Sequence, residues 1–359
     1  MFTLPAYNAP DFNAPSFRNS PDAEFTAAEA DMTAPDNFLA TSIYPTYVKT
    51  GGKWLLVKKI RMDCVIVLQN GSLSAVEFRR LKKGDLVLTG RAEDGSGGIF
   101  VNYDPFPVKQ EDGGVFSFRQ SRTRESSYSQ TYDELYEVLK HDRKDGFILW
   151  VMGPAAVFDY DSRKAFSLLI EKGYVNAVLA GNAFGTHDLE ASYFNTALGQ
   201  DVYTKRSVPN GHYHHIEILN KVRKSGSVAG FLKENNITDG VMYTLEKNKV
   251  PYVLAGSIRD DGPLPCVIGD AYRSQDEMRA LVGKATTVVA LATQLHTIAT
   301  GNMTPCYFTQ KDGSIRPVYF YIVDISEFAL NKLCDRGSLS ARGVVTNIQD
   351  FIVNLERNL

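Results

Sequence analysis

Two patterns of apolar residues divide the chain near residue 145. Beyond this point, short continuous apolar runs alternate with longer segments in which apolar residues recur at helical spacing. The runs, each expected to form a buried strand, lie at 147–152, 176–180, 252–255, 287–292, 318–323 and 343–346. The segments between them predict helices over 162–172, from about 188, and over 212–224, 227–235, 238–248, 274–282, 327–334 and 348–358. Strands that alternate with helices predict an α/β fold, with a mostly parallel, doubly wound sheet covered on both faces.

The part of the chain before residue 145 predicts a different architecture. Apolar runs at 54–57, 64–68, 81–88 and 115–118 predict strands, with Gln69-Asn70-Gly71 as a turn, and together they favour a small barrel or sandwich. Residues 1–40 are rich in Ala, Pro, Asp, Asn and Ser and lack periodicity, which predicts an extended or disordered arm, one that packs on a neighbouring subunit. We therefore expect an arm (1–40), a small β-rich domain (41–130) and an α/β domain (131–359) that opens with a helix over 131–144.

Composition and charge exclude several classes of protein. The chain has 359 residues, 44% hydrophobic residues and a net charge of -2, so no basic face for nucleic acid or a membrane surface is expected. No apolar run reaches the roughly 18 residues of a membrane span, and the N-terminus has no secretory signal. The four cysteines are scattered without a CxxC pair, which predicts free thiols in the cytoplasm and no metal site.

The turns that follow the predicted strands are the places to look for a ligand site. Ligands of an open parallel sheet bind beyond the carboxyl ends of the strands, and here the turns GPAA, AGNAFG and AGSIRDDG supply small residues there. No GxGxxG occurs, so each turn is a weak signal alone. Asp324 ends the run IVD, where a carboxylate commonly holds a ribose diol; it could equally cap the next helix, a role for which Ser326 competes.

The loop after 252–255 carries the like-charged pair Asp260-Asp261 beside Arg259. Two sheltered carboxylates push their pKa values apart, which can leave one of them as a general base. Adjacent residues of an extended loop point to opposite sides, however, so one carboxylate could bind a ligand while the other binds the backbone. Arg259 suits a substrate carboxylate because a guanidinium binds it with two hydrogen bonds. The three arginines of residues 119–130 are alternatives for this clamp, if that segment is more than a solvated linker.

Histidines form a second candidate group. His212, His214 and His215 begin a predicted helix, and a helix N-terminus favours the neutral imidazole that transfers protons. Structural hydrogen bonding is the alternative for each ring, and no carboxylate lies at metal-ligand spacing, so no metal is expected. His187-Asp188 and His296 follow predicted strands and are similar candidates.

Long motifs resemble one family. The segments GPAAVF, GYVNAVLAGNAFGTHDLEA, NGHYHHIEILNKVRKSGSVA, GVMYTLEKNKVPYVLAGSIRDDGPLP, LATQLHTIATGNM and DRGSLSARGVVTNI are similar to those of the LOR/SDH-region family, and TSIYPTYVKTGGKWLLV, MDCVIVL and LKKGDLVL also match. Its members are the archaeal-type NAD-dependent ornithine cyclodeaminases and the C-terminal part of the cyanobacterial bifunctional arginine dihydrolase/ornithine cyclodeaminase. The resemblance covers about residues 41–358 and implies a Rossmann-like domain similar to the NAD-binding half of deoxyhypusine synthase.

The resemblance also implies a tightly held NAD and a reaction, the conversion of L-ornithine to L-proline and ammonia. The NAD contacts that it implies, together with the Gly256 turn, are Asn182, Ala183, Gly256, Asp261, Thr293, Gln294, Leu295, His296, Asp324, Asn347 and Ile348. We expect acid/base work from Asp260 and one of the three clustered histidines, a carboxylate clamp from Arg259, and a homo-oligomer, either dimer or tetramer.

Departures from the family pattern leave alternatives open. The region before TSIYPT is short, Gln294 stands where the family often has Met, and Asn347 where it often has Asp. A related NAD-dependent cyclodeaminase or dehydrogenase that acts on another amino acid or diamine therefore stays possible, as does a non-catalytic NAD-binding regulatory protein. Deoxyhypusine transfer is disfavoured, because the AGSIRDDGPLP loop has no lysine to form an enzyme–imine adduct.

Overall fold

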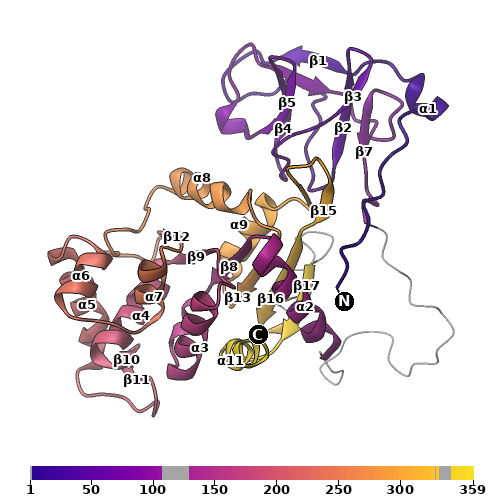
Figure 1. The fold of residues 1–359 in the computed structure, drawn as a ribbon. Coiled ribbons are helices and arrows are strands. Elements are labelled where there is room, and N and C mark those ends of the chain that lie inside the picture. Colours follow the sequence, from indigo (N-terminus) through magenta and orange to yellow (C-terminus); the bar gives the residue numbers. More distant parts are fainter. Residues whose placement is uncertain (1, 107–128, 328, 331–340) are drawn as a thin grey trace.

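The computed structural model describes residues 2–106, 129–327, 329–330 and 341–359. An antiparallel β-rich region lies at one end of the molecule, and a mixed α/β region built on a parallel sheet forms the rest (Figure 1). The predicted fold class is confirmed. The expected strand at 115–118 and the arginines of residues 119–124 lie outside the described residues, as does most of the helix expected over 327–334.

Six parallel strands form the central sheet. They are β8 (Ile148–Met152), β9 (Ala177–Gly181), β12 (Tyr252–Ala255), β13 (Thr287–Leu291), β16 (Tyr319–Asp324) and β17 (Ala341–Val345). Their spatial order is β12-β9-β8-β13-β16-β17, and all five pairings are parallel. Counted from β8, this is the order 3-2-1-4-5-6 of a doubly wound dinucleotide-binding sheet, with its switch point between β8 and β13.

Helices cover both faces of this sheet, which is why its strands are almost continuously apolar. The helices of this domain are α2 (Ser129–Asp145), α3 (Tyr160–Glu171), α4 (Asn182–Phe194), α5 (His214–Lys224), α6 (Val228–Glu234), α7 (Val241–Asn248), α8 (Ala271–Val282), α9 (Gln294–Met303) and α11 (Ile348–Asn358). Of these, α5 and α6 lie beside the sheet rather than on it (Figure 1). Successive β8 residues alternate between the two cores: Trp150 shares one core with Phe166 of α3 and Phe351 of α11, whereas Leu149 shares the other with Met278 of α8.

The connection between β9 and β12 is unusually long. It contains α4, α5, α6 and α7 together with the short hairpin of β10 (Thr196–Ala197) and β11 (Gln200–Asp201), and it forms the end of the molecule farthest from the β-rich region (Figure 1). Since a single helix suffices for a parallel crossover, the extra helices are an insertion at one side of the carboxyl edge of the sheet.

In the part of the β-rich region that the structure describes, the strands form two small antiparallel sheets. The strands are β1 (Glu24–Ala27), β2 (Thr46–Thr50), β3 (Lys53–Leu56), β4 (Val65–Gln69), β5 (Ser72–Val76), β6 (Leu86–Thr89) and β7 (Ile99–Val101). They pair in the orders β1-β6-β4-β5 and β3-β2-β7, around a core that includes Val48, Ile66 and Leu88. The predicted turn is present, since Asn70 and Gly71 both have positive φ and connect β4 directly to β5.

The N-terminal segment differs from the expected arm, because it packs on the domains of its own chain. Residues 24–27 form the edge strand β1, paired with β6. Phe12 stacks on Trp54 with ring centroids 4.9 Å apart, and the Lys49 ammonium donates hydrogen bonds to three backbone carbonyls of residues 17–20. A few aromatic anchors and a four-residue strand leave no periodic signal in the sequence, which explains the difference.

Charged side chains join the β-rich region to α8. Arg79 binds Asp276 at 2.5 Å, and Arg279 of α8 binds Glu77, which also binds Arg61 at 3.2 Å. Next to these pairs, a cleft of about 800 Å³ separates the two regions. The hairpin of β14 (Tyr307–Thr309) and β15 (Ile315–Pro317) extends from the α/β domain towards the β-rich region (Figure 1).

Candidate functional site

The carboxyl edge of the parallel sheet brings together residues that are far apart in sequence. The strands β9, β13 and β16 end beside Asn182, Thr293 and Asp324, and β12 ends at the Gly256-Ser257 turn. The expected site residues therefore lie along one edge, in the place where doubly wound sheets bind dinucleotides.

Backbones approach closely at the switch point of the sheet. The Gly153 N–H after β8 donates to the Leu291 carbonyl of β13 at 2.7 Å, and a Cβ atom at position 153 would lie 2.0 Å from the Ala292 carbonyl oxygen. At the end of β9, a Cβ atom at position 181 would lie 3.1 Å from the His296 ring. Glycine at position 153 therefore allows the two backbones to meet, and glycine at position 181 leaves room for the His296 ring.

Two helices begin at this edge without a side-chain cap. Gly181, which has no side chain, is the N-cap of α4. Thr293 is the N-cap of α9, and its hydroxyl contacts His296 Nδ1 at 3.3 Å instead of accepting from a backbone N–H of the first turn. Both helices therefore present N–H groups that lack an intrahelical partner, together with the positive end of the helix dipole. This arrangement suits a diphosphate. The expected NAD contacts Asn182, Ala183 and Thr293 to His296 lie at these two helix ends.

Asn182, Asp260 and His296 meet between α4, the loop after β12, and α9. The Asn182 amide donates to Asp260 Oδ1 at 3.5 Å, and its carbonyl oxygen accepts from the Leu264 N–H at 3.0 Å. Asp260 Oδ2 also accepts from the Ser257 N–H at 2.8 Å, so this carboxylate of the acidic pair binds backbone. Burial lowers the pKa of His296, and the Asp260 carboxylate opposes this effect only in part, which favours the neutral imidazole.

Other residues expected to contact NAD or the substrate, on the loop after β12 and at the start of α9, face solvent. Asp261, Arg259 and Gln294 are exposed, and Leu295 has 71% of its surface exposed. Gly256 is partly buried, and its N–H donates to the Ile268 carbonyl at 2.9 Å. Asp261 and Arg259 are therefore accessible to a ligand, whereas Gly256 contributes to the shape of the turn.

Asp324 and Ser326 differ in the backbone groups that they bind. The Ser326 hydroxyl accepts from the Ala329 N–H at 3.3 Å, as an N-cap does. Asp324 Oδ1 accepts from the Ser326 N–H at 2.8 Å, and its side chain is partly exposed at the strand end. The cap role belongs to Ser326, so the Asp324 carboxylate remains suited to a ribose diol.

Asn347 and Ile348 occupy structural positions. Asn347 is the N-cap of α11, and its side-chain oxygen accepts from the N–H groups of Gln349 and Asp350 at 2.8 and 3.3 Å. Ile348 is buried in the main core. The amide of Asn347 fulfils the capping role that an aspartate would also fulfil, and contact of either residue with NAD stays a prediction.

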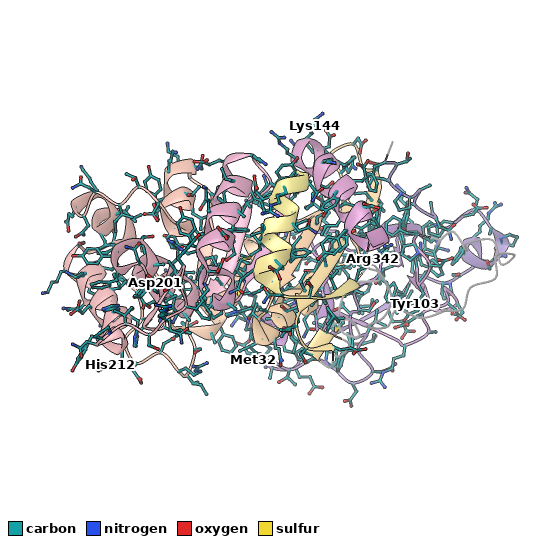
Figure 2. All side chains as sticks on the ribbon, turned by 90° about the horizontal axis from the view of Figure 1, so that it is seen from below. Met32, Tyr103, Lys144, Asp201, His212 and Arg342 are labelled. Atoms are coloured by element: carbon teal, nitrogen blue, oxygen red, sulfur yellow. The ribbon has the colours of Figure 1, made fainter. Side chains whose placement is uncertain are left out.

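The three clustered histidines separate from one another. His212 lies in a single 3₁₀ turn (Gly211–Tyr213) and is exposed at the outer end of the molecule, with its ring against Tyr213 (Figure 2). His214 stacks on Phe194 with ring centroids 4.3 Å apart, and His215 lies 6.1 Å from the His187 ring. Burial and then the charge of His187 lower the pKa of His215. His212 adds a smaller effect in the same direction from the turn before α5.

Sequence reasoning missed Glu190, which connects these rings. Its buried carboxylate accepts from His187 Nδ1 at 2.7 Å, from the Thr196 hydroxyl at 2.9 Å and from the Gly199 N–H at 3.2 Å. Burial raises the pKa of Glu190, but these donors outweigh burial and hold the pKa below its usual range. The spacing of His187 and Glu190, three residues apart on one helix face, was the available signal.

Close backbone packing holds the histidine segment next to Glu190. A Cβ atom at Gly211 would lie 2.4 Å from the Gly199 carbonyl oxygen, so the two glycines bring the β10–β11 hairpin against the turn that precedes α5. Gly199 itself has a φ of 73°, a conformation that favours glycine. Within the described residues, no group of three His, Cys, Asp or Glu side chains is arranged to hold a metal ion, and no helix there is long and apolar enough to cross a membrane.

Comparisons with known proteins agree with this architecture. Residues 133–355 match the family described as arginine dihydrolase ArgZ-like, C-terminal, Rossmann fold, and residues 45–130 match the first region of the same C-terminal part. The ornithine cyclodeaminase of Methanocaldococcus jannaschii is 38% identical over 347 residues, which cover 94% of this chain and 78% of that protein.

Two solved structures extend the likeness to three dimensions. A LOR/SDH protein from Methanococcus maripaludis S2 matches with a TM-score of 0.85 and 35% identity, over 94% of this chain and 98% of that chain. AgrE, the bifunctional arginine dihydrolase/ornithine cyclodeaminase of a Nostoc species, was solved in a ternary complex with ornithine and NAD+; it matches with a TM-score of 0.58 and 33% identity, over 95% of this chain and 46% of that chain.

Proposed function

The chain belongs to the arginine dihydrolase ArgZ-like C-terminal family, and we propose that it is an NAD-dependent ornithine cyclodeaminase. The reaction converts L-ornithine to L-proline and ammonia. Oxidation at the α-carbon gives an imine, the δ-amine attacks that carbon, the α-nitrogen leaves as ammonia, and reduction of the cyclic imine gives proline. The two redox steps cancel, so the cofactor is regenerated in each turnover.

The observation that carries this proposal is the pair of uncapped helix N-termini beside the switch point. The ends of α4 and α9 supply N–H groups for a diphosphate, and the Asp324 carboxylate is available for a ribose diol. When bound there, NAD supplies the acceptor and donor of the two electrons. Asp261, exposed on the opposite side of the crevice, is the second expected carboxylate contact.

The distribution of titratable groups supports one orientation of the substrate. Asp260 and His296 lie near Asn182 at the end of β9, and His187 and His215 lie on helices between β9 and β12. Among the expected residues that the structure describes, the end of β16 offers the partly exposed Asp324. We therefore place the reacting centre on the β9–β12 side and the ribose contact of Asp324 at the other end of the cofactor.

The residues on that side fit the needs of the substrate. Arg259 is exposed on the loop after β12, where it can bind an α-carboxylate. Asp260 is fixed by the Ser257 N–H and lies beside Asn182, which orients it as a proton acceptor. Water has to be excluded, because hydrolysis of the imine is the competing reaction.

Assembly and location are further parts of the proposal. Leu198, Tyr203, Tyr213 and Ile216 are each more than half exposed on the segment around the β10–β11 hairpin, which suits an interface between copies of this chain in a dimer or tetramer. Cys64 and Cys306 are buried free thiols and Cys266 is an exposed one, as suits a reducing cytoplasm. Light scattering of the purified protein measures the oligomer size.

The test follows both products from labelled substrate. Protein purified without added cofactor is denatured and its supernatant analysed for NAD by mass spectrometry, and the intact protein is incubated with ornithine that carries ¹⁵N at the α-position. Equal amounts of unlabelled proline and ¹⁵N-ammonium, without net NADH, are expected. Net NADH would indicate a dehydrogenase. Bound NAD without any turnover of ornithine, lysine or related diamines would indicate a regulatory protein.

A further inference from the structure

We propose that His187 is a proton acceptor and donor of this reaction and that the buried Glu190 is the residue that positions it. This inference rests on the proposed function. His187 and Glu190 occupy one face of α4, which begins with the expected NAD contact Asn182. His187 lies five residues further along, or about 7.5 Å along the helix axis. On its other side, its ring packs edge-on against Phe158, with centroids 5.4 Å apart, just after the turn that follows β8.

The hydrogen bonds around Glu190 determine which nitrogen of each ring carries the proton. Glu190 can only accept, so His187 Nδ1 must donate to it at 2.7 Å. The remaining nitrogen, Nε2, is then an acceptor in the neutral ring. The Thr196 hydroxyl gives its single proton to Glu190, so His214 Nδ1 must donate to that hydroxyl, at 2.7 Å. One carboxylate thus fixes the tautomers of two histidines.

This arrangement has the properties of a general base. His187 Nε2 takes one proton from the substrate ammonium, and the ring becomes an imidazolium whose charge Glu190 stabilises from the buried side. The same proton is available to the ammonia that leaves. A carboxylate that orients a histidine and stabilises its cation is the arrangement that gives a histidine base its efficiency. The side chain of Glu190 has no exposed surface, so its charge is not screened by solvent.

Other charged groups surround the pair and would contribute to its pH dependence. His215 faces the His187 ring from α5, and His212 lies on the turn before α5. Lys205 of the β11 loop binds the Phe158 carbonyl at 3.1 Å and the Asp159 carboxylate at 2.6 Å. Among the described residues, Glu190 is the charged group that forms a hydrogen bond with His187.

Substitution of His187 by Asn separates the structural role from the chemical one. The Asn amide can still donate to Glu190 from about the position of Nδ1, but it has no counterpart of Nε2. We expect His187→Asn to keep its bound NAD and its melting temperature, to lose about 10²–10⁴-fold in kcat, and to change the KM for ornithine far less. The acidic limb of the pH profile of kcat should also disappear.

A matched control exists at the opposite edge of the sheet. His141 donates from Nδ1 to the buried carboxylate of Asp142 at 2.8 Å, the same type of pair. His141→Asn should therefore leave kcat unchanged. If His187→Asn retains NAD and the kcat and pH profile of the unmodified protein, the proposal is wrong.

Glu190→Gln provides a second variant in case His187→Asn does not fold. Its neutral amide no longer stabilises the imidazolium, so the acidic limb of the profile should move to lower pH while kcat falls. A uniform loss of activity without that movement would give Glu190 a purely structural role and overturn its part of the proposal.

¹⁵N NMR of histidine-labelled protein shows the tautomer of His187 independently of turnover. A protein with the expected tautomer but no proline formation would reject the proposed function instead.

Discussion

Asp188 and Arg163 form a buried ion pair that connects three helices. Arg163 Nε of α3 lies 2.9 Å from Asp188 Oδ1 of α4, and 4% and 0% of the two side chains are exposed. The same carboxylate accepts from the N–H groups of Val241 and Met242, at 3.0 and 2.7 Å, and so caps α7. Asp188 therefore holds the inserted helices against the sheet, which is why this neighbour of His187 has a structural role.

Substitution of Asp188 by Asn should strongly lower the stability of the fold. The Arg163 guanidinium would stay buried without a counter-charge, which costs about 3–5 kcal/mol in the free energy of unfolding. Asp239→Asn is the control, because Asp239 is 65% exposed and lies 3.8 Å from Arg163, where a pair contributes about 1 kcal/mol at most. Calorimetry of both variants measures the difference, and equal melting temperatures would contradict the assignment.

Gly153→Ala should disturb the switch point of the sheet. The added Cβ atom would lie 2.0 Å from the Ala292 carbonyl oxygen, so β8 and β13 would have to separate. We expect a loss of about 1–3 kcal/mol in stability, together with weaker retention of NAD. Gly269→Ala is the matched change, since that Cβ atom meets no heavy atom within 4 Å and the glycine has no positive φ. Thermal unfolding and the NAD content of the purified variants provide the comparison.

Asp324→Asn should weaken NAD binding without loss of the fold. The Asn oxygen can still accept from the Ser326 N–H, but the charged acceptor for the ribose is lost. A hydrogen bond to a charged group contributes about 1.5–3 kcal/mol, which corresponds to roughly 10- to 100-fold in affinity. Calorimetric titration of cofactor-stripped protein measures this. Asp312→Asn, in the distant β14–β15 turn, should bind NAD as the unmodified protein does; an equal loss there would exclude a specific role for Asp324.

Glu77 should make the junction between the two regions sensitive to acid. Burial raises the pKa of Glu77, but its own backbone N–H and the guanidinium groups of Arg279 and Arg61 outweigh burial and hold the pKa below the ordinary value of 4.5. A depressed pKa means that the stabilisation is complete above pH 4.5 and disappears as the pH falls through the lower, folded-state value.

The test compares Glu77→Gln with the unmodified protein at several pH values. We expect the variant to be less stable by about 3 kcal/mol at neutral pH, because the buried Arg61 and the partly buried Arg279 lose their counter-charge. The difference in the free energy of unfolding should shrink as the pH is lowered below 4.5. A difference that stays constant into strong acid would show that the carboxylate is not the source of the stabilisation.

The central sheet could be predicted from the sequence because its strands are short, continuously apolar and bounded by glycine turns. The expected strand at 252–255 agrees with β12 at both ends, and the expected helix over 348–358 agrees with α11. Helix α9 was missed, since QLHTIATGNM contains two threonines, an asparagine and a glycine, which are poor helix formers. The helix forms nevertheless, because α9 packs against both β8 and α8 and this packing outweighs its weak helix propensity.

The sequence predicted the candidate site only for residues that directly follow a parallel strand. Residues such as Asn182 and Asp324 directly follow parallel strands, so their common edge was known once the strands were identified. Glu190 lies within a helix, and its role depends on a hairpin that folds back to supply Thr196 and Gly199. Contacts of that kind have no periodicity, so no pattern along the chain indicated them.

The contact between Gly199 and Gly211 closes the intervening loop at its neck. Val208 N–H also donates to the Gly199 carbonyl at 3.0 Å, and Gly211 N–H to the Val208 carbonyl at 3.0 Å, so both ends of the loop are held independently of its tip. When the two ends of a loop are held together, a longer loop lowers the stability of the fold only slightly. A peptide tag inserted at the tip, between Tyr203 and Thr204, should therefore leave Glu190 and its histidines in place while it blocks the interface proposed around Tyr203.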